Sequence, residues 1–118
     1  MSTWDDIDGQ TRGLNSEPYR TPAAVCAALG NEKRIELVAL LAKGALSATD
    51  LREKTGLSRS SLSQHMNILE ARGLVKARPM GRCVAYELAS TAVTDVYRAV
   101  ARLCRERIEG LRKLARQL

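Results

Sequence analysis

A three-residue connection, Gly56-Leu57-Ser58, most constrains the fold of this chain, because it joins two short segments that each carry helix signals. Ser47 is expected to cap the first helix, with Asp50 at the position where a capping box places an acidic side chain. Gly56 stops this helix, and Ser58 caps a second helix that starts at Arg59. Two short helices joined by so tight a turn predict a helix-turn-helix.

The segments around this unit add further helices and one pair of strands. Upstream, apolar spacing and bounding glycines predict helices over residues 21–29 and 32–42. Downstream, the sequence predicts two short strands, at about 74–78 and 82–88, around a Pro79-Met80-Gly81 turn. A last helix follows Ser90 or Thr91. The expected fold is mainly α with a small β-hairpin (α+β), in the order α-α-α-α-β-β-α.

The last predicted helix is longer than the core of so small a domain can cover. It has about 26 residues, or roughly 39 Å at 1.5 Å per residue. Its apolar residues keep a spacing of three or four: Val93, Val96, Tyr97, Val100, Leu103, Cys104, Ile108, Leu111 and Leu114. Such a stripe needs a partner, and a second copy of the chain is the simplest one, so we expect a homodimer.

Composition supports one aliphatic, mostly helical domain with a basic surface. The chain has 118 residues, of which 45% are hydrophobic and only 3% aromatic. Residues 1–20 hold four acidic residues against two arginines, so residues 21–118 carry a net charge of +8 against +6 for the whole chain. We therefore expect a flexible N-terminal arm, residues 1–20, and a basic domain, residues 21–118, that suits a polyanionic partner.

Several classes of protein are not supported by the sequence. No apolar run approaches the ~20 residues of a membrane span, and the N-terminus lacks the pattern of a secretory signal. Three cysteines do not make a disulfide framework, so a reducing cytoplasm is the expected location. The chain has one His, no Gly-rich phosphate loop and no nucleophile elbow, so we expect no enzyme activity.

The outer side of the second helix of the predicted helix-turn-helix is polar and almost uncharged. With its flanks and its first residue, this side carries Arg59, Ser60, Ser61, Ser63, Gln64 and Asn67. Short hydroxyl and amide side chains let a helix approach base edges in DNA and hydrogen-bond to them. Serines at a helix start are also common simply as caps, so a plain helical hairpin is the alternative interpretation.

The predicted hairpin adds basic side chains next to this helix. Lys76, Arg78 and Arg82 cluster near its turn and are placed to contact phosphates beside the groove that the helix would occupy. A solvated edge hairpin protected by charge would look the same in isolation. Directly after a helix-turn-helix, the hairpin is better interpreted as the wing of a DNA-binding domain.

The stretch from ALGNEKR through LSRSSLSQHMNILEARGLV to GRCVAYEL resembles the ArsR/SmtB family of bacterial winged helix-turn-helix repressors, over residues 21–104. The resemblance implies a homodimer built on the first and last helices, a recognition helix over 59–72 and a wing over about 75–88. Such proteins bind double-stranded operator DNA, usually repress their own operon and release the DNA when an inducer binds. His65 matches a His that serves the fold or DNA contact in family members.

The residues do not match two metal-site patterns that are widespread in this family. The stretch that matches a Cys-x-Cys motif, residues 46–50, has no Cys, and the last helix has Asp95, Glu106 and Glu109 but no His. Zinc, nickel and cobalt prefer clustered imidazole or thiolate ligands. We therefore expect no cofactor of this kind.

Cys26 in the first helix and Cys104 in the last are the candidate sensor thiols. The resemblance implies that these helices pack together at the dimer interface, and some relatives sense persulfides, oxidants or trivalent arsenicals through thiols. An oxidised or bridged pair would then shift the dimer geometry. Thiol-sensing relatives often carry their other Cys near the position of Val38, however. The alternative is that both thiols are small apolar core residues without a sensing role.

Two further functions stay open at this point. The chain could be a protein-interaction module that uses the long last helix, with a basic hairpin that serves only solubility. It could also be a DNA-binding regulator with no small-molecule or metal sensor. DNA binding is distinguished by salt, because it weakens steeply as the salt concentration rises.

Overall fold

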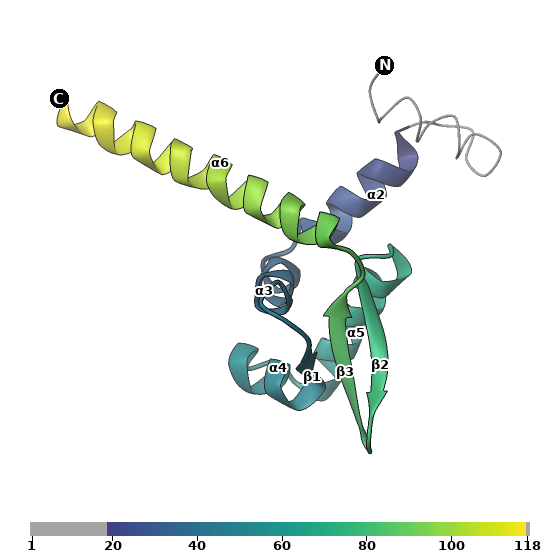
Figure 1. Ribbon diagram of the computed structural model, residues 1–118. Coiled ribbons are helices and arrows are strands. Elements are labelled where there is room, and N and C mark those ends of the chain that lie inside the picture. Colours follow the sequence, from purple (N-terminus) through teal and green to yellow (C-terminus); the bar gives the residue numbers. More distant parts are fainter. Residues whose placement is uncertain (1–18, 118) are drawn as a thin grey trace.

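The computed structural model describes residues 19–117, and Figure 1 shows a small body of helices and sheet from which one long helix extends. The elements in chain order are α2 (Arg20–Leu29), α3 (Glu32–Leu41), β1 (Leu46–Ser47), α4 (Ala48–Thr55), α5 (Arg59–Ala71), β2 (Val75–Met80), β3 (Cys83–Leu88) and α6 (Thr91–Arg116). The predicted fold class, mainly α with a β-hairpin, is confirmed. The two-residue strand β1 is an addition to the predicted order.

Side-chain caps start four of these helices where the sequence predicts them. Asn31, Ser47, Ser58 and Ser90 each accept a hydrogen bond from a backbone N–H in the first turn of α3, α4, α5 and α6. These bonds satisfy donors that have no partner within the helix. Gly56 ends α4 in the left-handed conformation, with φ of 75°. The tight turn between α4 and α5 is therefore built as expected.

The first described helix begins slightly earlier than predicted. Arg20 opens α2, so Thr21 and Pro22 lie within its first turn instead of starting it. Pro22 is tolerated there because the first N–H groups of a helix have no intrahelical acceptor. Residues 1–18 of the predicted arm lie outside the described residues.

The three strands form an antiparallel sheet in the order β1-β3-β2. Strands β2 and β3 pair as far as Met80 and Cys83, so the hairpin turn is Gly81 and Arg82. The predicted turn at Pro79-Met80-Gly81 is wrong by about two residues. β2 is an edge strand, which tolerates Pro79 because one side of its ladder has no partner. Gly81, with φ of 63°, provides the positive φ that a two-residue hairpin turn requires.

The core is aliphatic and joins the helix-turn-helix to α3 and the hairpin. Its largest fully buried side chains are Leu37, Val38, Leu51, Met66, Leu69 and Val75. They come from α3, α4, α5 and β2, so one small core holds the outward side of α5 in a fixed orientation toward solvent.

Helix α6 is only partly covered by the rest of the chain. It packs on α3 and β3, and Val93 near its start is buried. Beyond that start it runs away from the body (Figure 1), and its large apolar side chains are exposed: Val96, Val100, Leu103, Ile108, Leu111 and Leu114. No helix within residues 19–117 combines the length and the apolar character needed to cross a membrane.

Candidate nucleic-acid interface

Helix α5 exposes the polar side that the sequence predicts. Ser60, Ser63, Gln64 and Asn67 are exposed, and Ser61 is half-buried. The opposite side buries Leu62, Met66 and Leu69, as the 3.6-residue period of a helix requires. Because the core fixes the buried side, the four exposed polar side chains share one outward surface.

This outward surface of α5 has almost no charge. The only residues of the helix with a full charge are Arg59 at its start and Glu70 near its end. Amide and hydroxyl groups between them can donate and accept hydrogen bonds at base edges, and Arg59 can contact a base or a phosphate where the helix enters a groove. Ile68, 42% exposed, lies one turn after Gln64 and adds an apolar contact of the kind that suits a thymine methyl group.

A cleft of about 360 Å³ opens between α4, the start of α5 and β3. Three arginines line it: Arg52 from α4, Arg59 from α5 and Arg82 from the hairpin turn. No acidic residue lines it in the described part of the chain. Three cations around one cleft favour a polyanion such as the phosphate backbone of a nucleic acid.

The hairpin carries the three predicted basic side chains, and one of them, Arg82, lines this cleft. Lys76, Arg78 and Arg82 are all exposed. Arg78 is partly neutralised, because its guanidinium lies 3.6 Å from the carboxylate of Glu87 on the neighbouring strand. Arg82 stands in the turn and lines the same cleft as Arg59, so it is the hairpin cation that the structure brings to the start of α5.

Sequence reasoning missed three polar residues of the cleft: Thr49, Arg52 and Tyr86. Tyr86 reaches it because β3 pairs with β1, which brings the strand against the start of α4. Burial raises the pKa of the Tyr86 phenol, with a smaller contribution from the charge of Glu70, so its hydroxyl keeps its proton at neutral pH. A protonated phenol can donate a hydrogen bond to a phosphate. The pairing of a two-residue strand left no periodic signal from which to foresee this arrangement.

His65 does not share the outward surface of Gln64 and Asn67. Its ring is half-buried, and its Nδ1 lies 3.4 Å from the guanidinium of Arg34 on α3. Burial lowers the pKa of His65, and the positive charges of Arg34 and Lys33 lower it further. The structure therefore places His65 at the contact between α5 and α3, and direct contact with DNA stays a prediction.

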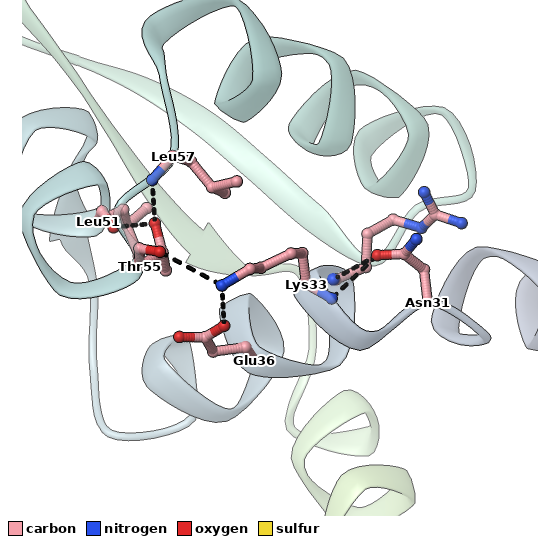
Figure 2. A network of polar contacts seen from close by, with 7 residues as sticks. Asn31, Lys33, Glu36, Leu51, Thr55 and Leu57 are labelled. Atoms are coloured by element: carbon pink, nitrogen blue, oxygen red, sulfur yellow. Dashed lines mark hydrogen bonds and ion pairs between the residues drawn. The ribbon is translucent and has the colours of Figure 1, made fainter.

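A polar network fixes the helix-turn-helix to α3, as Figure 2 shows. The ammonium group of Lys33 donates to the backbone carbonyl of Thr55 at 3.3 Å and to the carboxylate of Glu36 at 3.1 Å. The hydroxyl of Thr55 donates to the carbonyl of Leu51 at 2.7 Å and accepts from the N–H of Leu57 at 3.3 Å. Two of these bonds give partners to the Thr55 carbonyl at the end of α4 and to the Leu57 N–H in the turn.

The candidate sensor thiols are not brought together within one chain. Cys26 and Cys104 are both free and exposed, and Figure 1 shows α2 and α6 running apart from each other. Neither thiol is a buried core residue of the single chain. Within residues 19–117, no three His, Cys, Asp or Glu side chains gather in the way a metal site requires.

A helix-turn-helix with an uncharged polar recognition side, followed by a cationic hairpin, defines a winged helix-turn-helix protein, a DNA-binding class. The family model described as "Bacterial regulatory protein, arsR family" matches residues 31–77. A "Transcriptional repressor SmtB homolog" of Synechocystis is 39% identical over 92 residues, 78% of this chain and 70% of the relative. The chain belongs to the ArsR/SmtB family and is a DNA-binding transcriptional regulator.

Two further relatives show the same similarity in sequence and in structure. The "Transcriptional activator HlyU" of Vibrio cholerae is 37% identical over 76 residues, 64% of this chain and 70% of that protein. The homodimeric winged helix-turn-helix DNA-binding domain of Mb0332 from Mycobacterium bovis, solved in solution, superposes with a TM-score of 0.72 at 29% identity. That comparison covers 76% of this chain and 83% of the domain.

Proposed function

We propose that this protein is a transcriptional repressor that binds a double-stranded operator in the cytoplasm as a homodimer and leaves it when an inducer acts. The observation that carries the proposal is the uncharged outward surface of α5 beside a cleft lined by three arginines. The first feature suits base edges in a major groove, and the second suits the phosphates at the edge of that groove.

The proposed contacts divide by chemistry into two groups. Gln64 and Asn67 present amides that can bond adenine through two atoms, while Ser60, Ser61 and Ser63 can bond several base edges. Arg59, Lys76, Arg78 and Arg82 supply the positive charge for phosphates, together with Arg52, which the structure adds to this group. The first group would carry sequence preference, and the second would carry most of the affinity.

The proposed dimer uses α6 together with α2. Six large apolar side chains of α6 are between 43% and 65% exposed in the single chain. Exposing so much contiguous apolar surface to water is energetically unfavourable, so a partner is expected to cover it. The Mycobacterium bovis domain that superposes on this chain is a homodimer. A twofold dimer would present two copies of α5 to two half-sites of one operator.

Repression is the proposed direction of regulation. One relative is a repressor at 39% identity, and another is an activator at 37% identity, so relatives alone do not decide the direction. A dimer that occupies a promoter through its α5 helices blocks access to it unless it also contacts the transcription machinery. We therefore expect the chain to lower transcription from DNA upstream of its own gene.

A thiol-reactive inducer is the proposed signal, with Cys26 and Cys104 as the candidate residues. The observation in its favour is that both thiols are exposed in one chain and that Cys104 lies next to Leu103 on the proposed dimer surface. A trivalent arsenical would bond both sulfurs, and a persulfide donor or another oxidant would join them by oxidation. The alternative is a regulator with no sensor, whose DNA occupancy follows its abundance.

Fluorescence anisotropy on DNA upstream of the gene tests this proposal. Reduced protein is compared with protein treated with a persulfide donor and with arsenite. Salt-sensitive binding that is lost on treatment would support a repressor with a thiol inducer. In that case Cys26→Ser and Cys104→Ser should still bind the DNA after the same treatment. Binding that is unchanged by both treatments would exclude the thiol signal and leave the DNA-binding function supported. No binding at low salt would contradict this operator and favour a protein-interaction module built on α6.

A further inference from the structure

Arg34 touches two other helices from its place on the first turn of α3. Its Nε donates a hydrogen bond to the backbone carbonyl of Ala28, at the end of α2. Its Nη1 lies 3.4 Å from Nδ1 of His65, in the middle of α5. One side chain therefore links α2, a helix of the proposed dimer surface, to the helix that carries the proposed recognition residues.

Both contacts are well matched chemically. The carbonyl of Ala28 belongs to the last turn of α2, where carbonyls lack helical partners and a cation complements the helix dipole. An arginine side chain has donors only, so His65 must accept through an unprotonated Nδ1 and carry its proton on Nε2. The pKa of His65 is lowered by burial and by Arg34 and Lys33, which agrees with a neutral ring.

Because His65 directly follows Gln64 on α5, the contact between Arg34 and His65 also affects the orientation of Gln64. Successive residues of an α-helix are about 100° apart around its axis. Holding His65 against Arg34 therefore also fixes the direction of Gln64, the preceding residue, which is exposed. A change in how α2 lies against α3 would reach Gln64 through the two contacts of Arg34 and the single backbone step from His65 to Gln64.

We propose that Arg34 is a positioning residue that fixes the orientation of α5 relative to α2 and thereby sets how well the protein distinguishes its operator from random DNA. This inference rests on the proposed function, in which α5 reads base edges. Arg34 acts in it through His65 and Ala28. The two contacts join the Arg34 side chain to α2 and to α5. Removing that side chain therefore changes the orientation of α5 and leaves the proposed phosphate-binding cations in place.

The first test needs no DNA and uses the fact that His65 is the single His of the chain. Its imidazole is titrated by NMR in the full-length protein, in Arg34→Met and in the control Lys43→Met, which removes an exposed cation from the turn after the other end of α3. We expect Arg34→Met to raise the pKa of His65 and to mix its two neutral tautomers, and Lys43→Met to change neither. An Arg34→Met protein with the wild-type titration and tautomer would overturn the link.

The second test measures affinity for operator and random DNA as a function of salt. We expect Arg34→Met to weaken operator binding about tenfold and random DNA binding by less than roughly twofold, with an unchanged salt slope. Arg34→Lys keeps the charge but lacks the two-armed geometry, so it should lose discrimination as well. If Arg34→Met does not fold, Arg34→Lys replaces it in this DNA-binding test.

The outcomes separate this proposal from the function on which it rests. Equal losses on both DNAs, or no loss on either, would overturn the positioning role while wild-type binding still supports a regulator. Wild-type protein that does not prefer operator over random DNA would contradict the proposed function itself, whatever the titration of His65 shows.

Discussion

The ammonium group of Lys33 donates a hydrogen bond to the backbone carbonyl of Thr55 over 3.3 Å, which ties the start of α3 to the end of α4. Thr55 is buried, and its own hydroxyl bonds the carbonyl of Leu51 and the N–H of Leu57 (Figure 2). The turn of the helix-turn-helix thus depends on one buried threonine. The direction of α5 depends on that turn.

Thr55→Val is expected to destabilise the protein although it keeps the shape of the side chain. It removes the acceptor of the Leu57 N–H and leaves that group without its protein partner, which costs about 1–3 kcal/mol. Urea unfolding of variant and wild type at one protein concentration measures the change, since the stability of a dimer depends on concentration. Thr49→Val, an exposed change on the same helix, should stay within about 0.5 kcal/mol. Equal stability of Thr55→Val and wild type would show that the hydrogen bonds of Thr55 contribute nothing to the free energy of unfolding.

Gln64→Ala is expected to weaken binding to the operator more than binding to random DNA. The exposed amide of Gln64 is placed to bond a base edge, and one such contact is worth about 1–3 kcal/mol of discrimination. Anisotropy titrations with both DNAs measure the difference. The same change at Glu70, exposed near the end of α5, is the control and should leave discrimination intact. An equal loss on both DNAs for Gln64→Ala would contradict its role in sequence preference.

Arg82→Ala is expected to weaken binding to every DNA and to lower its salt dependence. Arg82 lines the cleft and is placed for a phosphate, and each phosphate contact contributes about 0.9 to the slope of log K against log salt. Lys113→Ala removes an exposed cation from the far part of α6 and should leave the slope as it is. If Arg82→Ala kept the wild-type slope, the cleft would not be a phosphate site.

Leu103→Lys is expected to separate the proposed dimer. Leu103 is 65% exposed in one chain, and a lysine there would bury an unpaired charge in the α6 interface. Light scattering at micromolar concentration should give a dimer for the wild type and a mass near 12.9 kDa for the variant. Arg105→Gln, on the other side of α6, should remain dimeric. A monomeric wild type would contradict the dimer directly.

The parts of the fold that depend on local chemistry could be predicted from the sequence. Ser47 and Ser58 cap the helices they were expected to cap, and Gly56 ends α4, because each of these roles involves only neighbours in the chain. The exposed polar side of α5 was predictable for the same reason. A helical period places Gln64 opposite Met66 without any knowledge of other elements.

The parts that depend on contacts between distant segments could not be predicted. Arg52 lines the cleft only because α4, α5 and the hairpin meet there, and β1 is too short to show a strand pattern. His65 contacts Arg34 although the two residues are 31 positions apart in the sequence, and that contact depends on how α5 lies against α3. Pro79 suggested a turn, but an edge strand accommodates it, and edges are defined only once the sheet is assembled.

The stability of the fold is expected to fall below about pH 6.5 through His65. The pKa of this His is lowered in the folded protein from an ordinary value near 6.5, so the unfolded chain binds its proton first as the pH falls. The stability that neutral His65 contributes is therefore fully present above about pH 6.5. It is lost as the pH falls from there toward the lower pKa of the folded state.

His65→Asn isolates this effect, because an asparagine side chain keeps an acceptor near the position of Nδ1 and has no proton to gain. Urea unfolding at pH 7.5 and pH 5.5 is measured for both proteins at one concentration. Since the chain has no other His, the wild type should lose more stability on acidification than the variant, and the difference belongs to this ring. Identical losses for the two proteins would mean that His65 titrates alike in the folded and unfolded states, and that Arg34 does not hold it neutral.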